Sequence, residues 1–135
     1  MNQESYFCTQ IEFGTPECDQ ALRLRDLVLR KPLGMSFEPN DIAKEYDSYH
    51  LACYHVDTHE MVATLILKPI SKGIVKMRQV AVAPNLQSLG IGSLLVQASE
   101  NFAKDKGFSK IELHARDTAV PFYLKAGYTK EGDVF

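Results

Sequence analysis

Apolar residues follow two patterns along this chain: short runs that favour strands, and a spacing of three and four residues that favours helices. The run Val80–Val82 has high strand propensity, and Pro84 ends it because proline has no N–H to donate to a sheet. From Ile91 onward the apolar residues have helical spacing: Leu94, Leu95, Ala98, Phe102 and Ala103. We therefore expect a strand, a turn, and a helix that begins near Gly90 and ends at Gly107.

The rest of the chain shows further strands and helices in alternation. Strands are expected at Tyr6–Phe13, Tyr49–Val56, Met61–Leu67, Ile74–Val82 and Lys110–Ala115, and from Tyr128 onward. Other helices are expected from the N-cap Thr15 to a point before Pro32, around Asp41–Tyr46, and at Ala119–Ala126. No repeat or linker interrupts this order, which predicts a single α/β domain over residues 1–135.

The turn before the predicted long helix has the features of an anion-binding loop. It reads Gln87-Ser88-Leu89-Gly90-Ile91-Gly92. The first N–H groups of a helix have no intrahelical acceptor, and the helix dipole adds a partial positive charge there. Glycine at two positions lets the backbone approach a ligand closely, so a pyrophosphate would suit the loop. The alternative is an ordinary glycine turn before an amphipathic helix.

Two nucleotide-binding motifs fit this loop poorly. No Gly-Lys-Ser/Thr follows it, which excludes a Walker-type loop, and Leu95 stands where the dinucleotide fingerprint requires its third glycine. A dinucleotide site would also need an acid about 20 residues further on, and Glu112 is near that spacing. The dinucleotide interpretation is therefore weak but still open.

Composition and charge restrict the classes of function. The chain has 135 residues, 45% of them hydrophobic, which is enough for one domain with a genuine core. A net charge of −2 does not indicate binding to nucleic acid, and no cluster of Lys and Arg residues indicates binding to a membrane surface. Cys8, Cys18 and Cys53 are odd in number and lack C-x-x-C spacing, so we expect inert thiols and no metal. Without a leader or a long apolar run, the chain is predicted to be cytoplasmic.

Two motifs resemble those of the GCN5-related N-acetyltransferase (GNAT) superfamily. The loop at residues 87–92 matches the family pattern Q/R-x-x-G-x-G/A, directly after a V-A-V-A-P strand end. The segment Thr118–Tyr128 is similar to the second family pattern N-x-x-A/P-x-x-F-Y-x-x-x-G-F/Y, with Thr118 in place of the usual Asn. The resemblance is sharp from Met77 to Tyr128. It implies a GNAT-like acyl-CoA N-acyltransferase fold, a mixed and twisted α+β sheet with helices on both faces.

The family fold also implies one more strand after the position of Phe135. We therefore expect this last strand to be absent, removed, or supplied by a partner. A homodimer is one arrangement that stays open.

The resemblance implies transfer of the acetyl group of acetyl-CoA to a primary amine of a small molecule or peptide, by direct attack in a ternary complex. Backbone groups of Val80, Ala81 and Val82 would pair with the pantetheine arm, and Thr118 would add a cofactor contact. The pyrophosphate would bind at Gln87, Ser88, Leu89, Gly90, Ile91 and Gly92. A non-catalytic acyl-CoA-binding module is the alternative.

The implied reaction needs a proton donor and a base. Tyr123 stands where the family places the tyrosine that protonates the thiolate leaving group, and the Val80 N–H would stabilise the oxyanion. Without the family, Tyr123 is better explained as an aromatic on the buried face of a short helix, next to Phe122. Glu112 and His114 project to one face of their predicted strand, and we take Glu112 as the candidate base. Either residue could instead be a solvated or hydrogen-bonded edge residue.

Overall fold

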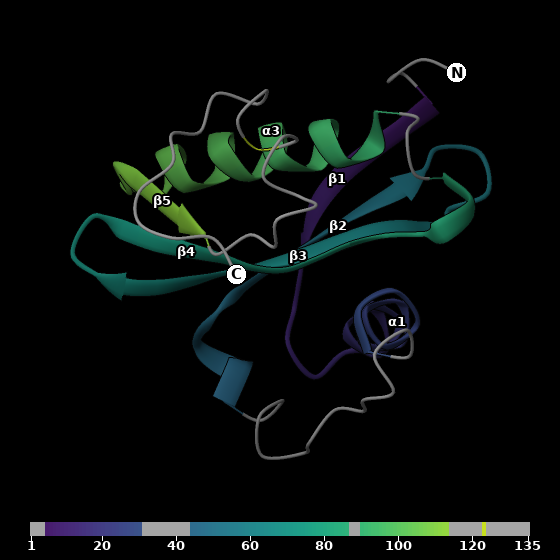
Figure 1. The fold of residues 1–135 in the computed structure, drawn as a ribbon, viewed down its shortest axis with the longest axis horizontal. Coiled ribbons are helices and arrows are strands. Elements are labelled where there is room, and N and C mark those ends of the chain that lie inside the picture. Colours follow the sequence, from purple (N-terminus) through teal and green to yellow (C-terminus); the bar gives the residue numbers. More distant parts are fainter. Residues whose placement is uncertain (1–4, 31–43, 87–89, 114–122, 124–135) are drawn as a thin grey trace.

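The computed structural model describes residues 5–30, 44–86, 90–113 and 123, and these residues form one mixed sheet between two helices. The sheet has five strands in the order β1-β2-β3-β4-β5. Neighbouring strands are antiparallel from β1 to β4, whereas β4 and β5 are parallel. The strands are β1 (Tyr6–Ile11), β2 (Tyr49–His55), β3 (Met61–Ser71), β4 (Ile74–Val82) and β5 (Lys110–Leu113). The predicted mixed sheet is confirmed (Figure 1).

The two α-helices cover opposite faces of this sheet, as Figure 1 shows. They are α1 (Pro16–Arg25) and α3 (Ile91–Asp105). Short helical turns complete the described elements: the π-helical η2 (Asp26–Arg30) and the 3₁₀ turns η4 (Lys44–Asp47) and η5 (Pro84–Leu86). None of the helices in the described ranges has the length and apolar character needed to cross a membrane.

Each face of the sheet has its own apolar core. Under α3, buried leucines and valines of the central strands pack against Ile91 and Leu95 of the helix. Under α1, Ile11 and Ala21 pack with Ala52 and Tyr54 of β2. Odd and even positions of β2 thus point to different helices, as the strand period of two requires. We call these surfaces the α3 face and the α1 face.

A buried ion pair joins the end of α1 to η4. Arg25 donates from Nη1 and Nη2 to the two carboxylate oxygens of Glu45, each at 2.8 Å. Both side chains are almost completely buried, at 2% and 9% exposure. The Glu45 carbonyl oxygen also lies 3.0 Å from Nε2 of the buried His50 at the start of β2. The pair therefore fixes two segments that are 20 residues apart along the chain.

Most predicted elements are present, with four changes at their ends, one of which is that β2 ends one residue early, at His55. β4 has the predicted bounds, while β1 ends two residues early, at Ile11. β3 was predicted to end at Leu67 but continues to Ser71, through Pro69. β2 begins opposite Leu67, so beyond that point β3 pairs only with β4 among the described strands, and an edge position accepts a proline. The first helix is α-helical only to Arg25 and then turns π-helical.

Several predictions fall outside the described residues. These are the end of the strand predicted at 110–115, most of the helix predicted at 119–126, the strand from Tyr128, and the question of a further family strand. The predicted helix around residues 41–46 overlaps the described turn η4.

Candidate active site

An extra residue in β4 shapes the centre of the candidate site. Thr64 of β3 pairs with Ala81 of β4, and Ile66 pairs with Arg78. Over this stretch β4 therefore advances three residues while β3 advances two. Gln79 lies inside this β-bulge and has a positive φ of 57°. A bulge bends its strand and increases the local twist. β4 therefore changes direction just before Val80.

The bulge also changes which face the following side chains occupy. Val75 and Met77 lie in the core under α3, and regular alternation would send Val80 to the opposite face. Instead, the half-buried Val80 and Val82 pack against this same core, and Ala81 is buried at 1% exposure. The side chains of Val80 and Val82 thus have a packing role on the α3 face. The ligand role predicted for these residues concerns their backbone groups.

Pairing of β4 with β5 is described only for the first half of β4. It runs from Ile74 opposite Lys110 to Met77 opposite Leu113, whereas β4 itself continues to Val82. The described register with β5 thus ends just before the bulge. The segment Val80–Val82 still pairs with β3 on its other edge.

The N-terminus of α3 begins at a glycine in the left-handed region. Gly90 is the N-cap, with φ 84° and ψ 1°. The Leu94 N–H donates to the Gly90 carbonyl at 3.0 Å, which is the first intrahelical bond. The N–H groups from Gly90 to Ser93 therefore have no acceptor within the helix. The predicted start of this helix is confirmed.

A comparison with α1 shows how unusual this helix start is. At α1, the Thr15 hydroxyl accepts a hydrogen bond from the Cys18 N–H at 3.3 Å, and the acids Glu17 and Asp19 occupy the first turn. These groups satisfy the N–H donors and the positive end of the helix dipole. At α3, Gly90 provides no capping side chain and the first turn has no acid. Among the described residues, the N-terminus of α3 thus lacks the capping side chain and the acids present at the start of α1, and a helix start of this kind favours an external anion.

Tyr123 packs against the same core as β4 and α3. It has helical backbone, its side chain is half-buried, and it contacts the core that contains Ile91 and is bordered by Val80 and Val82. Burial raises the pKa of the Tyr123 phenol above its ordinary value of 10.0. The phenol is therefore neutral at physiological pH and holds a proton that it can donate.

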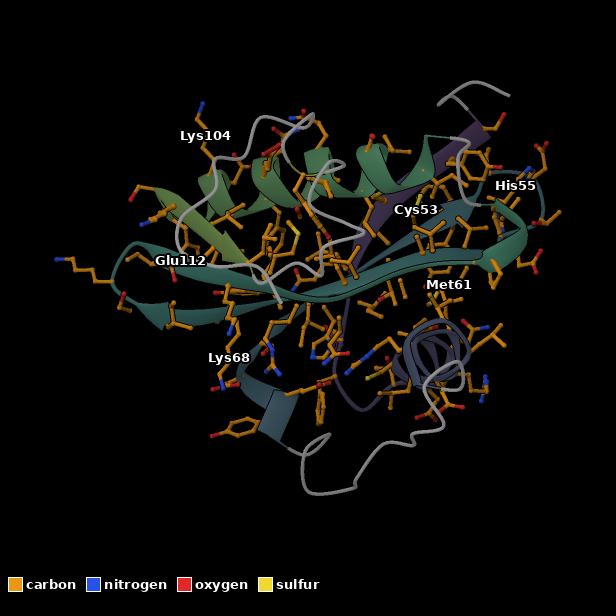
Figure 2. The ribbon with its side chains drawn as sticks, in the orientation of Figure 1. Cys53, His55, Met61, Lys68, Lys104 and Glu112 are labelled. Carbon is orange, nitrogen blue, oxygen red and sulfur yellow. The ribbon has the colours of Figure 1, made fainter. Side chains whose placement is uncertain are left out.

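Glu112 lies on the other face of the sheet. Its neighbours Ile111 and Leu113 pack against the core under α3, so Glu112 points to the α1 face. It is in register with Lys76 and forms a partly exposed ion pair with Lys110, at 3.5 Å. Figure 2 shows Glu112 beside β4 and β5. Such an exposed pair contributes at most about 1 kcal/mol to stability.

The structure thus brings together part of the predicted site. Val80, Val82, Ile91 and Tyr123 border one core, and Gly92 follows Ile91 in α3, whereas Glu112 is on the opposite face. Gln87, Ser88, Leu89, Thr118 and His114 lie outside the described residues. The roles predicted for all of these residues stay predictions.

Gln79 is the structural determinant that sequence reasoning missed. A positive φ is typical of glycine and, less often, of asparagine or aspartate, so glutamine gives no local signal for a bulge. A weak signal does exist in the pattern of β4. Val75 and Met77 are two residues apart, whereas Met77 and Val80 are three apart, which breaks the strand period.

Comparisons of the sequence with known proteins indicate one protein family. The sequence profile of the acetyltransferase (GNAT) family matches residues 19–128. The uncharacterized N-acetyltransferase YjcF of Bacillus subtilis (strain 168) is 30% identical over 108 residues, which cover 80% of this chain and 75% of that protein.

Two solved structures have the same fold at low sequence identity. One is an aminoglycoside acetyltransferase from an uncultured soil metagenomic sample, in complex with sisomicin, at a TM-score of 0.79 and 19% identity, covering 98% of this chain and 93% of that one. The other is glucosamine-6-phosphate N-acetyltransferase from Arabidopsis thaliana, at a TM-score of 0.71 and 13% identity, covering 96% and 95%. The family match spans most of the sequence, and the chain belongs to the acetyltransferase (GNAT) family.

Proposed function

We propose that this chain binds acetyl-CoA with its pyrophosphate at the N-terminus of α3 and its pantetheine arm along Val80–Val82 of β4. The observation that carries the proposal is the start of α3 at Gly90, where the described residues provide no capping side chain and no acid in the first turn. A diphosphate would accept hydrogen bonds from the first N–H groups and would complement the helix dipole. The amide groups of pantetheine can pair with strand backbone as an added strand does.

The proposed reaction is attack of a primary amine on the thioester carbonyl. The oxyanion that develops would accept a hydrogen bond from the Val80 N–H, next to the bulge at Gln79. The C–S bond then breaks, and the thiolate of CoA takes a proton from Tyr123. A thiol has a pKa of about 8.5, so transfer from a phenol with a pKa above 10.0 is uphill by at least about 2 kcal/mol. Tyr123 therefore protonates the leaving group as the bond breaks rather than before.

The amine must lose a proton, and Glu112 is the candidate base. Glu112 is in register with Lys76, four residues from Val80, which is roughly 13 Å at ordinary strand spacing. That separation exceeds the reach of a glutamate side chain. We therefore propose that the proton reaches Glu112 through ordered water.

The proposed acceptor is a primary amine of a small molecule or peptide. Among the structural neighbours, an aminoglycoside acetyltransferase and a glucosamine-6-phosphate N-acetyltransferase act on small amines by name. These likenesses support the class of acceptor for this chain and leave its identity to experiment. The cytoplasmic location predicted from the sequence is part of the same proposal.

Calorimetric titration with acetyl-CoA, CoA and NAD in parallel tests the cofactor. We expect micromolar binding of both CoA species and none of NAD. NAD binding alone would contradict the proposal and favour the dinucleotide interpretation. A screen of primary amines for release of CoA then tests turnover, and CoA binding without turnover of any amine would favour a non-catalytic acyl-CoA-binding module.

A further inference from the structure

Two of the three cysteines stand directly opposite each other across neighbouring strands. Cys8 of β1 pairs with Cys53 of β2 in an antiparallel register that runs without a shift from Tyr6–His55 to Ile11–His50. Just outside this ladder, the Val56 N–H donates to the Ser5 carbonyl at 2.8 Å, which marks a hydrogen-bonded pair. Hydrogen-bonded and non-hydrogen-bonded pairs alternate in such a ladder.

The position of Cys8 and Cys53 in this alternation brings their side chains close together. Three steps from the Ser5–Val56 pair, the two cysteines form a non-hydrogen-bonded pair, with a Cα separation of about 4.5 Å. This separation falls within the range of about 4.4–6.8 Å that a disulfide can bridge. The register of the two strands is therefore compatible with a disulfide between these cysteines.

The two thiols also differ in accessibility and acidity. A hydrogen bond from Cys53 lowers the pKa of the Cys8 thiol. The same hydrogen bond, with burial, raises the pKa of Cys53. Cys8 is half-buried, whereas Cys53 is completely buried. Cys8 is thus the thiol that ionises and meets an oxidant first, and Cys53 is the protonated thiol held against it.

We propose that Cys8 and Cys53 form an oxidation site, at which a hydroperoxide converts the two thiols into a disulfide between β1 and β2. The Cys8 thiolate attacks the terminal peroxide oxygen and forms an S–O bond as the O–O bond breaks, so that Cys8 becomes a sulfenic acid. The other peroxide oxygen leaves as hydroxide or alkoxide and takes a proton from water. The Cys53 sulfur then attacks the Cys8 sulfur. An S–S bond forms as the S–O bond breaks, and the Cys53 proton leaves with the hydroxyl group as water.

The site lies in the core beneath α3, apart from Glu112. Cys53 is buried in the same core as Ile91 and Leu95 in the first turns of the helix, and Figure 2 shows it beneath that helix, toward the other end of the sheet from Glu112. The disulfide would link β1, which is the edge strand of the described sheet, to β2. None of the proposed steps of acetyl transfer uses either cysteine, so this site is independent of the proposed function.

Peroxide treatment of the full chain tests the site. The protein would be treated with hydrogen peroxide, unfolded with a thiol-alkylating reagent present, and digested for peptide mass spectrometry. We expect the loss of two of the three free thiols, a linked Cys8–Cys53 peptide, an alkylated Cys18, and full recovery after reduction with dithiothreitol. Cys18 is the internal control because it is buried in α1.

Variants separate this pair from other outcomes. Cys18→Ala should form the disulfide at the wild-type rate, and Cys8→Ser should form none. Because Cys8 is half-buried, Cys8→Ser should fold, which its melting curve would verify. A linkage that includes Cys18, a disulfide between two copies of the chain, or oxidation of Cys8 to a sulfinic acid without a linkage would overturn the proposal. Equal rates of Cys8–Cys53 linkage in buffer and in urea would also overturn the proposal.

Discussion

Substitution of Gly90 by valine should remove CoA binding while the protein stays folded. Gly90 has φ +84°, and among the described residues no atom lies within 4 Å of a Cβ built there. Relative to these residues the new side chain therefore lies in open space, and it meets the pyrophosphate when CoA binds. Gly107 provides a matched control at the other end of α3, with φ +91° and the same open surroundings among the described residues.

The two substitutions should cost similar stability but very different affinity. A left-handed conformation costs an L-residue about 1–2 kcal/mol, which lowers the melting temperature of a domain of this size by roughly 3–8 °C. At Gly90 the variant also loses hydrogen bonds to a charged phosphate, each worth about 1.5–3 kcal/mol. Loss of two such bonds weakens CoA binding by roughly 10²–10⁴-fold.

Calorimetry with CoA measures this difference, and acetyl-pantetheine, which lacks the pyrophosphate, checks its origin. Gly90→Val should bind acetyl-pantetheine as the wild-type protein does, and Gly107→Val should bind both ligands normally. Wild-type affinity of Gly90→Val for CoA would refute the assignment of the pyrophosphate to α3. Equal losses in both variants would show that strain in the helix, and not contact with the ligand, controls binding.

Four further predictions concern single side chains. Tyr123→Phe should lower kcat by about 10²–10⁴-fold and leave CoA affinity unchanged; wild-type turnover would assign Tyr123 to packing alone. Glu112→Gln should lower kcat/KM, and wild-type kcat/KM would exclude Glu112 as the base. Burial raises the pKa of Tyr123. The pKa of Tyr54 is raised mainly by burial and, to a smaller extent, by the charge of a nearby glutamate. Their neutral forms are favoured in the folded state, so the stability that these two groups contribute should be fully present below about pH 10 and should be lost as pH rises further. Urea unfolding of the two Tyr→Phe variants over this range tests this, because each variant should have a flatter profile there. Arg25→Met should lower the free energy of unfolding in urea by about 3–5 kcal/mol, because it leaves Glu45 buried without its partner. The double variant Arg25→Met with Glu45→Leu should recover most of this loss. A loss below about 1 kcal/mol in the single variant would contradict the prediction.

Local patterns in the sequence were sufficient for the elements that carry the site. β4 has its predicted bounds because a strand run is stopped at both ends, by Gly73 and by Pro84. The start of α3 follows from Gly90, and its end follows from Gly107, because a helix tends to stop where the backbone turns left-handed. These features depend on a few adjacent residues, so the sequence alone could predict them.

The features that could not be predicted depend on residues far apart in the chain. The Cys8–Cys53 pair is created by the register of β1 on β2, and an odd number of cysteines without close spacing gave no sign of it. The Arg25–Glu45 pair depends on where η4 packs relative to α1. Placement of Glu112 opposite Lys76 likewise follows from a parallel pairing of two strands that are separated by a helix.

The bulge at Gln79 gives β4 one residue more than β3 over the same stretch of sheet. Deletion of one residue there would restore a regular ladder and would leave Val80 and Val82 toward α3 and Ala81 toward α1, because the two residues of the bulge together occupy one position of the alternation. When relatives are aligned with this chain, a gap at this position would therefore signal a cofactor edge without this bend, and not a change in which side chains face the core. Substitution by Asn or Gly, which accept a positive φ, would keep the residue count and the edge.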